Sequence, residues 1–405
     1  MPLDTFVCPL SKGALSLVSF EEERIKLTPE QLARAKRLEI APEKLSRVVK
    51  TGVLYCPLSR KWYPIINYVP LLLDYATEIH RDFINQHASR TSIFGEYEMP
   101  NGVPRPGEEV VQKSFTKEWA TLNVEKNISF GLTPEQRDSF IGFELDWPVG
   151  FLNREKLKIL EVGCGSGFES LSLDRVTQGE IFGIDLNLTL LRNGAALAQH
   201  PFVHVASASL FAIPMPEADF DIVYSSGVLH HTHSTKAAFD SIIKYRKSDG
   251  LIYIWVYAQE DMDRTMHTRI DWIREDIFRP RLAKLSDFWQ DLVVKVMAKK
   301  HYKIYKATGN YSKDLWTFEN SVHFIRDRWT ALYAHRHSFK EVIIWFLDND
   351  LEYKLVDPKA YYEHFRVPLI GIGIRGVPRE TLTQLRDGRV EPPSAEAVRG
   401  AVGLG

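Results

Sequence analysis

Residues 157–167 read Leu-Lys-Ile-Leu-Glu-Val-Gly-Cys-Gly-Ser-Gly, a short apolar strand that runs directly into a glycine loop. Glycines at a strand-to-helix turn let the backbone pass close to a ligand, because no Cβ is in the way. A dinucleotide-binding fingerprint has the pattern G-x-G-x-x-G, and its third glycine would fall at Phe168. A side chain of that size prevents close packing of the helix, so this loop differs from the dinucleotide type.

Three later segments read as further strands of the same sheet. Residues 180–185 form an apolar run that ends in Asp185, about 20 residues after the glycines. In a doubly wound sheet a carboxylate at this position lies beside the cofactor ribose and can accept bonds from both hydroxyls. Residues 220–232 read as a fourth strand with its turn, and residues 249–257 as a turn with a fifth strand. The order predicts an α/β fold.

Taken together, these segments resemble the ordered motifs of class I S-adenosylmethionine-dependent methyltransferases over roughly residues 115–257. The resemblance implies a Rossmann-like, seven-stranded, doubly wound sheet whose last strand is antiparallel, with S-adenosylmethionine as the cofactor. Its motifs place the cofactor at Glu161, Gly163, Cys164, Gly165, Gly167, Asp185, Leu186, Ser209, Leu210 and Ser226.

One position departs from that family. Its members usually have an aspartate at the end of the third strand, where it holds the adenine amino group. The matching segment, residues 208–214, has Ser209 there instead. A serine oxygen can still accept one hydrogen bond, or stacking and backbone contacts can hold the adenine.

Composition excludes several classes of protein. Lys and Arg total 51 and Asp and Glu total 52, which leaves no electrostatic footprint for nucleic-acid binding. We find no apolar run long enough to span a bilayer and no secretion signal. Three cysteines in 405 residues favour a reducing compartment without a disulfide framework. We therefore expect a soluble, cytoplasmic protein. The family resemblance implies a small-molecule acceptor, and a homodimer is possible.

Two segments near the N-terminus echo each other. Residues 8–13 read Cys-Pro-Leu-Ser-Lys-Gly and residues 56–61 read Cys-Pro-Leu-Ser-Arg-Lys. They resemble the zinc-ribbon activator subunit of tRNA and protein methyltransferases, except that Ser11 and Ser59 occupy the second ligand position of each knuckle. Two thiolates and two hydroxyls hold zinc poorly, so we expect no metal and a ribbon held by packing. It either docks, on the catalytic domain or a partner, or only adds stability.

These patterns divide the chain into four parts. The ribbon-like α+β module carries an inserted helical hairpin. The methyltransferase domain carries a helical insertion that we interpret as a lid over the cleft. The Pro- and Gly-rich connector and the tail have no predicted regular structure. The expected parts are residues 1–75 (module), 76–114 (connector), 115–376 (methyltransferase domain, insertion about 258–338) and 377–405 (disordered tail).

The insertion contains an amphipathic pattern. Apolar side chains recur at helical spacing from Leu285 to Val296, and we expect them to pack on their own domain. The lysines that follow, from Lys295 to Lys306, form either a solvated face or a patch for an anionic substrate or a membrane surface. After the insertion, residues 338–347 predict a helix capped by Ser338.

Methyl transfer asks little of a protein beyond alignment and, where required, removal of a proton. His230 and His231 follow the fourth strand, and His231 is the better-placed base. Tyr257, at the end of the fifth strand, could hydrogen-bond the acceptor. By the family resemblance, Phe115 and Trp119 line the site, although both could equally pack in the core.

A second pair of histidines, His335 and His337, precedes the last helix with an arginine between them. They could bind an anionic group and move a proton, or they could cap the helix and pair locally. His233 reads as a surface loop residue. The catalytic candidates are therefore His231, His335, His337 and Tyr257.

The function that the resemblance implies is S-adenosylmethionine-dependent methylation of a small molecule on oxygen, nitrogen or carbon. The insertion and the aromatic content favour a bulky, partly apolar acceptor. Two alternatives stay open: methylation of tRNA or a protein factor with a fused activator, and a non-catalytic cofactor-binding scaffold.

Overall fold

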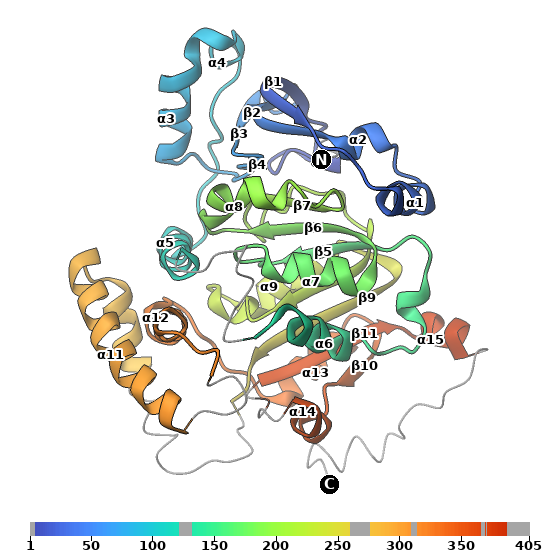
Figure 1. Cartoon of the computed structure of the whole chain (residues 1–405), viewed down its shortest axis with the longest axis vertical. Coiled ribbons are helices and arrows are strands. Elements are labelled where there is room, and N and C mark those ends of the chain that lie inside the picture. Colours follow the sequence, from blue (N-terminus) through green and yellow to red (C-terminus); the bar gives the residue numbers. More distant parts are fainter. Residues whose placement is uncertain are drawn as a thin grey trace.

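Two β-sheets lie against each other in the computed structural model of the chain (Figure 1). One has four strands in the order β1-β2-β3-β4, and the other has seven in the order β10-β11-β9-β8-β5-β6-β7. The structure describes residues 5–120, 132–259, 276–308, 314–365, 369 and 371–386.

The seven-stranded sheet confirms the predicted α/β fold. Strands β5 to β9 pair in parallel, whereas β11 is antiparallel to both of its neighbours, β9 and β10. Most residues of the parallel strands are buried, as expected for strands covered by helices on both faces. The strands are β5 (Lys158–Val162), β6 (Glu180–Asp185), β7 (Val203–Ser207), β8 (Phe220–Ser226), β9 (Arg246–Tyr257), β10 (Leu351–Leu355) and β11 (Gly371–Pro378).

Helices connect these strands. The backbone N–H of Glu341 donates to Ser338 Oγ at 3.2 Å, so the predicted serine cap is present. The helices are α6 (Pro134–Glu144), α7 (Phe168–Thr177), α8 (Thr189–Leu197), α9 (Thr235–Ile243), α13 (Phe339–Leu347), α14 (Pro358–Phe365) and α15 (Arg379–Arg386), with 3-10 turns η4 (Phe151–Asn153) and η5 (Leu229–His231).

Two segments predicted to lack regular structure contain helices. In the predicted tail, α15 packs Leu382 on the core, and Thr381 Oγ1 donates to Asp249 O at 3.1 Å. The predicted connector contains α3, whose Phe83 packs with Trp62. Tertiary packing therefore orders segments whose composition favours loops. The connector elements are α3 (Glu78–His87), η2 (Ala88–Arg90), α4 (Ile93–Glu96) and α5 (Glu108–Trp119).

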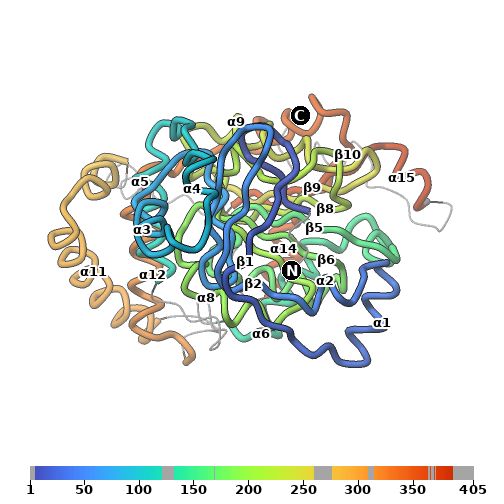
Figure 2. The backbone as a smooth tube through the Cα atoms, turned by 90° about the horizontal axis from the view of Figure 1, so that it is seen from above, coloured from blue at the N-terminus to red at the C-terminus, as the bar shows by residue number. Residues whose placement is uncertain are grey.

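The helical insertion stands at one side of the molecule (Figures 1 and 2). Helix α11 (Asp287–Thr308) packs on α12 (Phe318–Thr330) through Val294 and Ala298, which contact Ile325. The apolar face predicted to pack on the domain is instead exposed, with Phe288 at 69%. The prediction was wrong because the small Ala298, on the opposite face, lets the two helices approach closely.

The N-terminal module continues the edge of the large sheet at β7. Leu72 N donates to Ser207 O at 2.8 Å, and the ring of Phe6 lies edge-on to Phe182, 6.2 Å away. An unpaired edge strand is a template for aggregation, and here the module covers it. The module comprises β1 (Ser16–Arg24), β2 (Arg47–Cys56), β3 (Lys61–Ile66), β4 (Val69–Pro70), α1 (Pro29–Arg37) and α2 (Pro42–Ser46).

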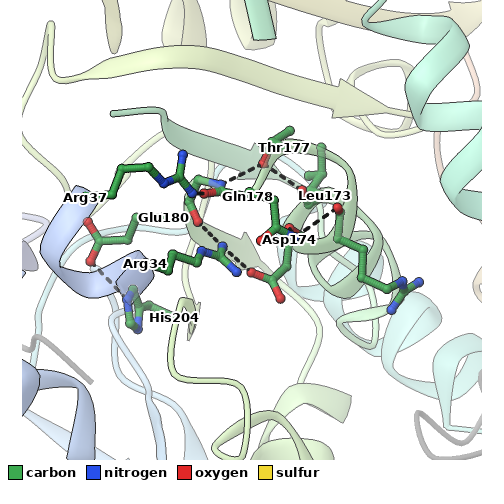
Figure 3. A network of polar contacts seen from close by, with 10 residues as sticks. Arg34, Arg37, Leu173, Asp174, Thr177, Gln178, Glu180 and His204 are labelled. Carbon is green, nitrogen blue, oxygen red and sulfur yellow. Dashed lines mark hydrogen bonds and ion pairs between the residues drawn. The ribbon is translucent and has the colours of Figure 1, made fainter. Parts of the chain in front are cut away.

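Two arginines of α1 fasten the module to the end of α7 (Figure 3). Arg34 Nη2 lies 2.5 Å from Asp174 Oδ1 and also donates to Gly179 O, while its guanidinium covers the ring of Phe202. Arg37 Nη2 donates to Gln178 O at 2.7 Å. These contacts join residues far apart in the sequence.

We expect Arg34→Ala to lower the free energy of unfolding by about 2 kcal/mol, because it leaves buried acceptors without their charged donor. The Arg34 and Asp174 side chains are only 12% and 16% exposed. Chemical denaturation measures the loss. The matched control is Arg47→Ala, which breaks an exposed pair with Glu22 and should change stability by less than about 0.5 kcal/mol. Equal losses in the two variants would contradict a special role for the Arg34 contact.

The two echoed segments of the module bring their cysteines and serines together. Cys8 Sγ lies 3.3 Å from Ser59 Oγ, and Ser11 Oγ lies 3.4 Å from Cys56 Sγ. The phenol of Tyr63 contacts Cys8 Sγ at 3.3 Å. Among the described residues, no group of three His, Cys, Asp or Glu side chains could hold a metal ion. Thiol–hydroxyl contacts thus occupy the positions that four thiolates would need.

The double variant Ser11→Cys/Ser59→Cys is expected to bind one zinc ion, because it brings four thiolates together, as in structural zinc sites. Elemental analysis of the purified protein gives the zinc content, with the wild type and each single variant as controls. A double variant with no more zinc than the wild type would show that the four positions do not form such a site.

Candidate active site

A cavity of about 640 Å³ opens at the carboxyl ends of the parallel strands, where ligands bind in doubly wound sheets. Residues at the ends of β5, β6, β7, β8 and β9 form one wall. Helices α5, α6 and α12 and the segment after α12 contribute to the rest of the lining. Part of the insertion therefore borders the cavity. Residues from the strand ends include Gly163, Cys164, Asp185, Leu186, Leu210, Ser226 and Tyr257.

The glycine loop after β5 fits only because its glycines have no Cβ. Gly163 has a φ of 87°, and a Cβ there would lie 2.1 Å from Val228 Cγ2. Gly165 has a φ of 58°, and its Cβ would lie 2.8 Å from the ring of Trp119. Gly163 lines the cavity, whereas Gly165 and Gly167 do not. The latter two shape the turn rather than the wall.

Asp185 lies on the cavity wall with its carboxylate held by backbone amides. Oδ2 accepts from Gly165 N at 2.7 Å and Oδ1 accepts from Asn187 N at 2.8 Å. Desolvation raises the pKa of Asp185 to about 6, although both amide bonds oppose that shift. The side chain therefore presents an oriented carboxylate at neutral pH.

Besides Gly165 and Gly167, two more residues predicted to bind the cofactor, Glu161 and Ser209, lie off the cavity wall. The Glu161 carboxyl accepts from the hydroxyl of Ser170 on α7, and burial raises its pKa to about 8. The Ser209 hydroxyl donates to Glu108 and accepts from Phe211 N. Glu161 and Ser209 therefore support neighbouring elements.

Glu108, the first residue of α5, lines the cavity beside Ser209. Its Oε2 accepts from Arg105 N at 2.7 Å, and its other oxygen accepts from Ser209. The side chain is buried, and desolvation raises its pKa. A carboxyl group thus stands next to the end of β7, although it comes from a residue about 100 positions earlier. No signal in the sequence identified it.

The predicted base His231 faces a carboxylate from the insertion. Its Nδ1 lies 2.7 Å from Tyr333 O, and its Nε2 lies 3.3 Å from Asp327 Oδ1. Tyr257 donates its phenolic proton to Asp327 Oδ2 at 2.9 Å. Burial opposes ionisation of Asp327, but the contacts with His231 and Tyr257 hold its pKa below the usual range. All three residues line the cavity.

His335 and His337 lie off the cavity wall and bond locally, which matches the second of the two alternatives. His335 Nε2 lies 3.0 Å from Thr232 O, and His337 Nε2 lies 2.8 Å from Thr235 Oγ1. Their backbone amides join the segment to η5 and to the end of β9. The residue between them, Arg336, lines the cavity instead.

The remaining histidines of the region, His230 and His233, differ in their relation to the cavity. His233, predicted to be a surface loop residue, lines the cavity and packs on Phe211. His230 is fully buried behind the wall, its ring 3.9 Å from that of Tyr257. Burial lowers the pKa of His230 well below its usual value, so its ring is neutral.

Phe115 and Trp119 of α5 both line the cavity. Phe115 lies edge-on to His231, with 5.0 Å between the ring centroids. Between them on the same helix, Glu118 is 2% exposed, and its Oε1 lies 3.4 Å from His323 Nε2. Desolvation raises the pKa of Glu118 well above its usual value.

Three arginines of the insertion also line the cavity: Arg279, Arg328 and Arg336. Arg336 Nη1 lies 3.0 Å from Asp276 Oδ1, and Arg279 Nη1 lies 3.8 Å from the same oxygen. Their guanidinium groups make this side of the cavity the more cationic one. The sequence suggested anion binding at Arg336 and at the lysines from Lys295 to Lys306, but not at Arg279 or Arg328.

Residues 160–254 match the family model described as a methyltransferase domain. The mitochondrial arginine-hydroxylase NDUFAF5 of Rattus norvegicus is 30% identical over 139 residues, which are 34% of this chain and 38% of that protein. Phosphoethanolamine N-methyltransferase of Triticum aestivum is 27% identical over 104 residues, 25% of this chain and 21% of that protein. The chain thus spans less than two fifths of the length of either relative.

Among solved structures, the Burkholderia thailandensis 1,6-didemethyltoxoflavin-N1-methyltransferase has a TM-score of 0.39 at 13% identity, covering 69% of this chain and 92% of that chain. The residues that match the family model, 160–254, run from β5 to β9 along the chain and include the glycine loop and Asp185. The chain therefore carries a class I S-adenosylmethionine-dependent methyltransferase domain.

Proposed function

We propose that the protein transfers the methyl group of S-adenosylmethionine to a small organic acceptor that carries an anionic group. The observation behind this proposal is that one cavity joins two different walls. The glycine loop and the amide-held Asp185 are on one side, and His231, Asp327 and the arginines of the insertion are on the other. Such a cavity suits two ligands that meet between the walls.

The residues of the first wall fit the cofactor. Gly163 would present its backbone to the cofactor at the cavity wall, and Asp185 would accept bonds from the ribose hydroxyls. S-adenosylmethionine supplies an activated methyl group when bound, so no residue has to activate the donor. The contribution of the protein is alignment and, for an acidic acceptor, removal of a proton.

Glu108 would replace the aspartate that this chain lacks at Ser209. Ser209 and Arg105 N orient its carboxyl group beside the end of β7, and each carboxyl oxygen retains acceptor capacity. It would accept a hydrogen bond from the adenine amino group. The serine therefore supports the cofactor indirectly, by positioning Glu108.

The second wall indicates the chemistry of the acceptor. Guanidinium groups recognise carboxylate and phosphate, and three of them line this side of the cavity. His231 would take up the proton that an oxygen or nitrogen nucleophile releases, and the Asp327 carboxylate beside it would stabilise the protonated ring. The name of the wheat relative specifies a phosphate-bearing acceptor, which supports an anionic ligand.

The N-terminal module would be a degenerate, fused form of the zinc-ribbon activator of tRNA and protein methyltransferases. Its paired Cys–Ser contacts support this relationship. In this chain the module covers the β7 edge of the large sheet (Figure 1), so it would act on the stability of the domain rather than on the acceptor.

Titration with S-adenosylmethionine in a calorimeter tests the cofactor wall. We expect micromolar binding by the wild type, no measurable binding by Asp185→Ala, and roughly tenfold weaker binding by Glu108→Gln, because one hydrogen bond to a charged group is lost. The control is Glu109→Gln, which changes the exposed neighbour. A cofactor analogue without the 6-amino group should bind the wild type and Glu108→Gln equally. A residual difference would contradict the adenine contact.

The pH dependence of cofactor affinity follows from the raised pKa of Asp185, about 6. Only the carboxylate accepts from both ribose hydroxyls, so the association constant should fall about tenfold per pH unit below pH 6. The contribution of Asp185 to the stability of the ligand-free protein should change in the opposite direction. A carboxyl whose folded pKa exceeds its unfolded value stabilises the fold as the pH falls through 6. Calorimetry and thermal melts measure the two trends, and Asp185→Asn should abolish both.

The reaction itself is tested by incubating the protein and S-adenosylmethionine with pools of small carboxylates and phosphate esters. Mass spectrometry should detect S-adenosylhomocysteine together with a product that has gained one methyl group. The rat relative is named an arginine hydroxylase. A product that gained an oxygen atom instead would refute methyl transfer, even if the cofactor binds.

A further inference from the structure

We propose that the outer face of α11 docks the protein on an anionic bilayer surface. By the outer face we mean the exposed apolar residues Phe288, Trp289, Leu292 and Val296 and the exposed lysines Lys295, Lys299, Lys300, Lys303 and Lys306. This inference does not depend on the reaction in the cavity, because none of these side chains lines it.

Helix α11 lies at the periphery of the molecule. It is the outermost element on its side in two perpendicular views, with α12 between it and the body of the protein (Figures 1 and 2). Its inner face, with Val294 and Ala298, contacts α12. The outer face therefore projects from the body along most of the 22-residue helix.

The first half of the outer face is apolar. Phe288 is 69% exposed, Trp289 56%, and Val296 64%, and the rings of Phe288 and Trp289 lie 5.2 Å apart. Just before the helix, Ile277 and Phe278 are also about half exposed. Aromatic side chains next to aliphatic ones on a surface helix are typical of insertion at the level of lipid headgroups.

The second half of the same face is cationic. From Leu292 to the end of the helix the sequence contains five lysines and no acidic residue. At 100° per residue, Lys299, Lys303 and Lys306 fall on the same side as Phe288 and Leu292. The two acidic residues of the helix already pair with basic groups outside it: Asp287 with Lys113 and Lys117, and Asp291 with Arg326.

An anionic bilayer matches both halves better than a second copy of the chain does. Two copies packed antiparallel along α11 would set the lysines of one against the apolar half of the other. Parallel packing would set lysine against lysine. A bilayer surface accepts the apolar rings at the boundary of the acyl chains, and the lysine stems extend to the phosphates. No helix of the described chain has both the length and the apolarity to cross a bilayer, so the docking is peripheral.

Co-sedimentation of the full chain with lipid vesicles tests the proposal. We expect the protein to partition about tenfold more strongly onto phosphatidylcholine vesicles that contain phosphatidylglycerol than onto vesicles of phosphatidylcholine alone. High salt should weaken it. Phe288→Ser/Trp289→Ser and Lys299→Glu/Lys303→Glu should each reduce partition about tenfold. The control is Leu58→Ser/Val149→Ser, which removes residues that are 73% and 65% exposed elsewhere and should leave partition unchanged.

Two results would overturn the proposal. One is wild-type protein that does not prefer anionic vesicles, or that keeps the preference after Phe288→Ser/Trp289→Ser. The other is a wild-type protein that sediments as a dimer in analytical ultracentrifugation while the Phe288→Ser/Trp289→Ser variant sediments as a monomer. That result would make the outer face of α11 the interface of a homodimer. S-adenosylmethionine binding by every α11 variant should match the wild type. A failed vesicle experiment with intact cofactor binding thus rejects the docking and leaves the proposed reaction standing.

Discussion

The turn after β5 is so tightly enclosed that three other elements are fixed by it. A Cβ on Gly163 would overlap Val228, which follows β8, and a Cβ on Gly165 would overlap the ring of Trp119 on α5. The same turn donates Gly165 N to the carboxylate of Asp185 at the end of β6. Close packing of this kind leaves little freedom, so the loop, the aromatic ring and the carboxylate keep one arrangement.

Local patterns were enough to predict the large sheet. Three apolar runs predict parallel strands: one ends at the glycine loop, one ends at Asp185, and one ends before His230 and His231. The carboxyl ends of these strands form one wall of the cavity. The topology followed because a doubly wound sheet has few alternatives once the strand order is known. No comparable sequence pattern marks the residues of the insertion that line the cavity.

The residues that the sequence did not reveal reach the cavity from distant segments. Glu108 and Asp327 each sit on a helix whose approach to the sheet depends on tertiary packing, and no spacing rule connects them with Ser209 or His231. The outer face of α11 was misjudged for a related reason. An amphipathic pattern shows that a face exists, but the small Ala298 on the opposite side decides which face packs.

Helix α5 touches both ends of the cavity. Its first residue, Glu108, lies beside the end of β7, and its last, Trp119, covers the glycine loop. Twelve residues of α-helix form a rod of about 18 Å that bends little over this length. A tilt that moves one end therefore moves the other as well. Binding of a ligand beside Glu108 at the first turn and the position of Trp119 at the last turn are therefore linked. The free energy that couples them is the same whichever of the two changes first.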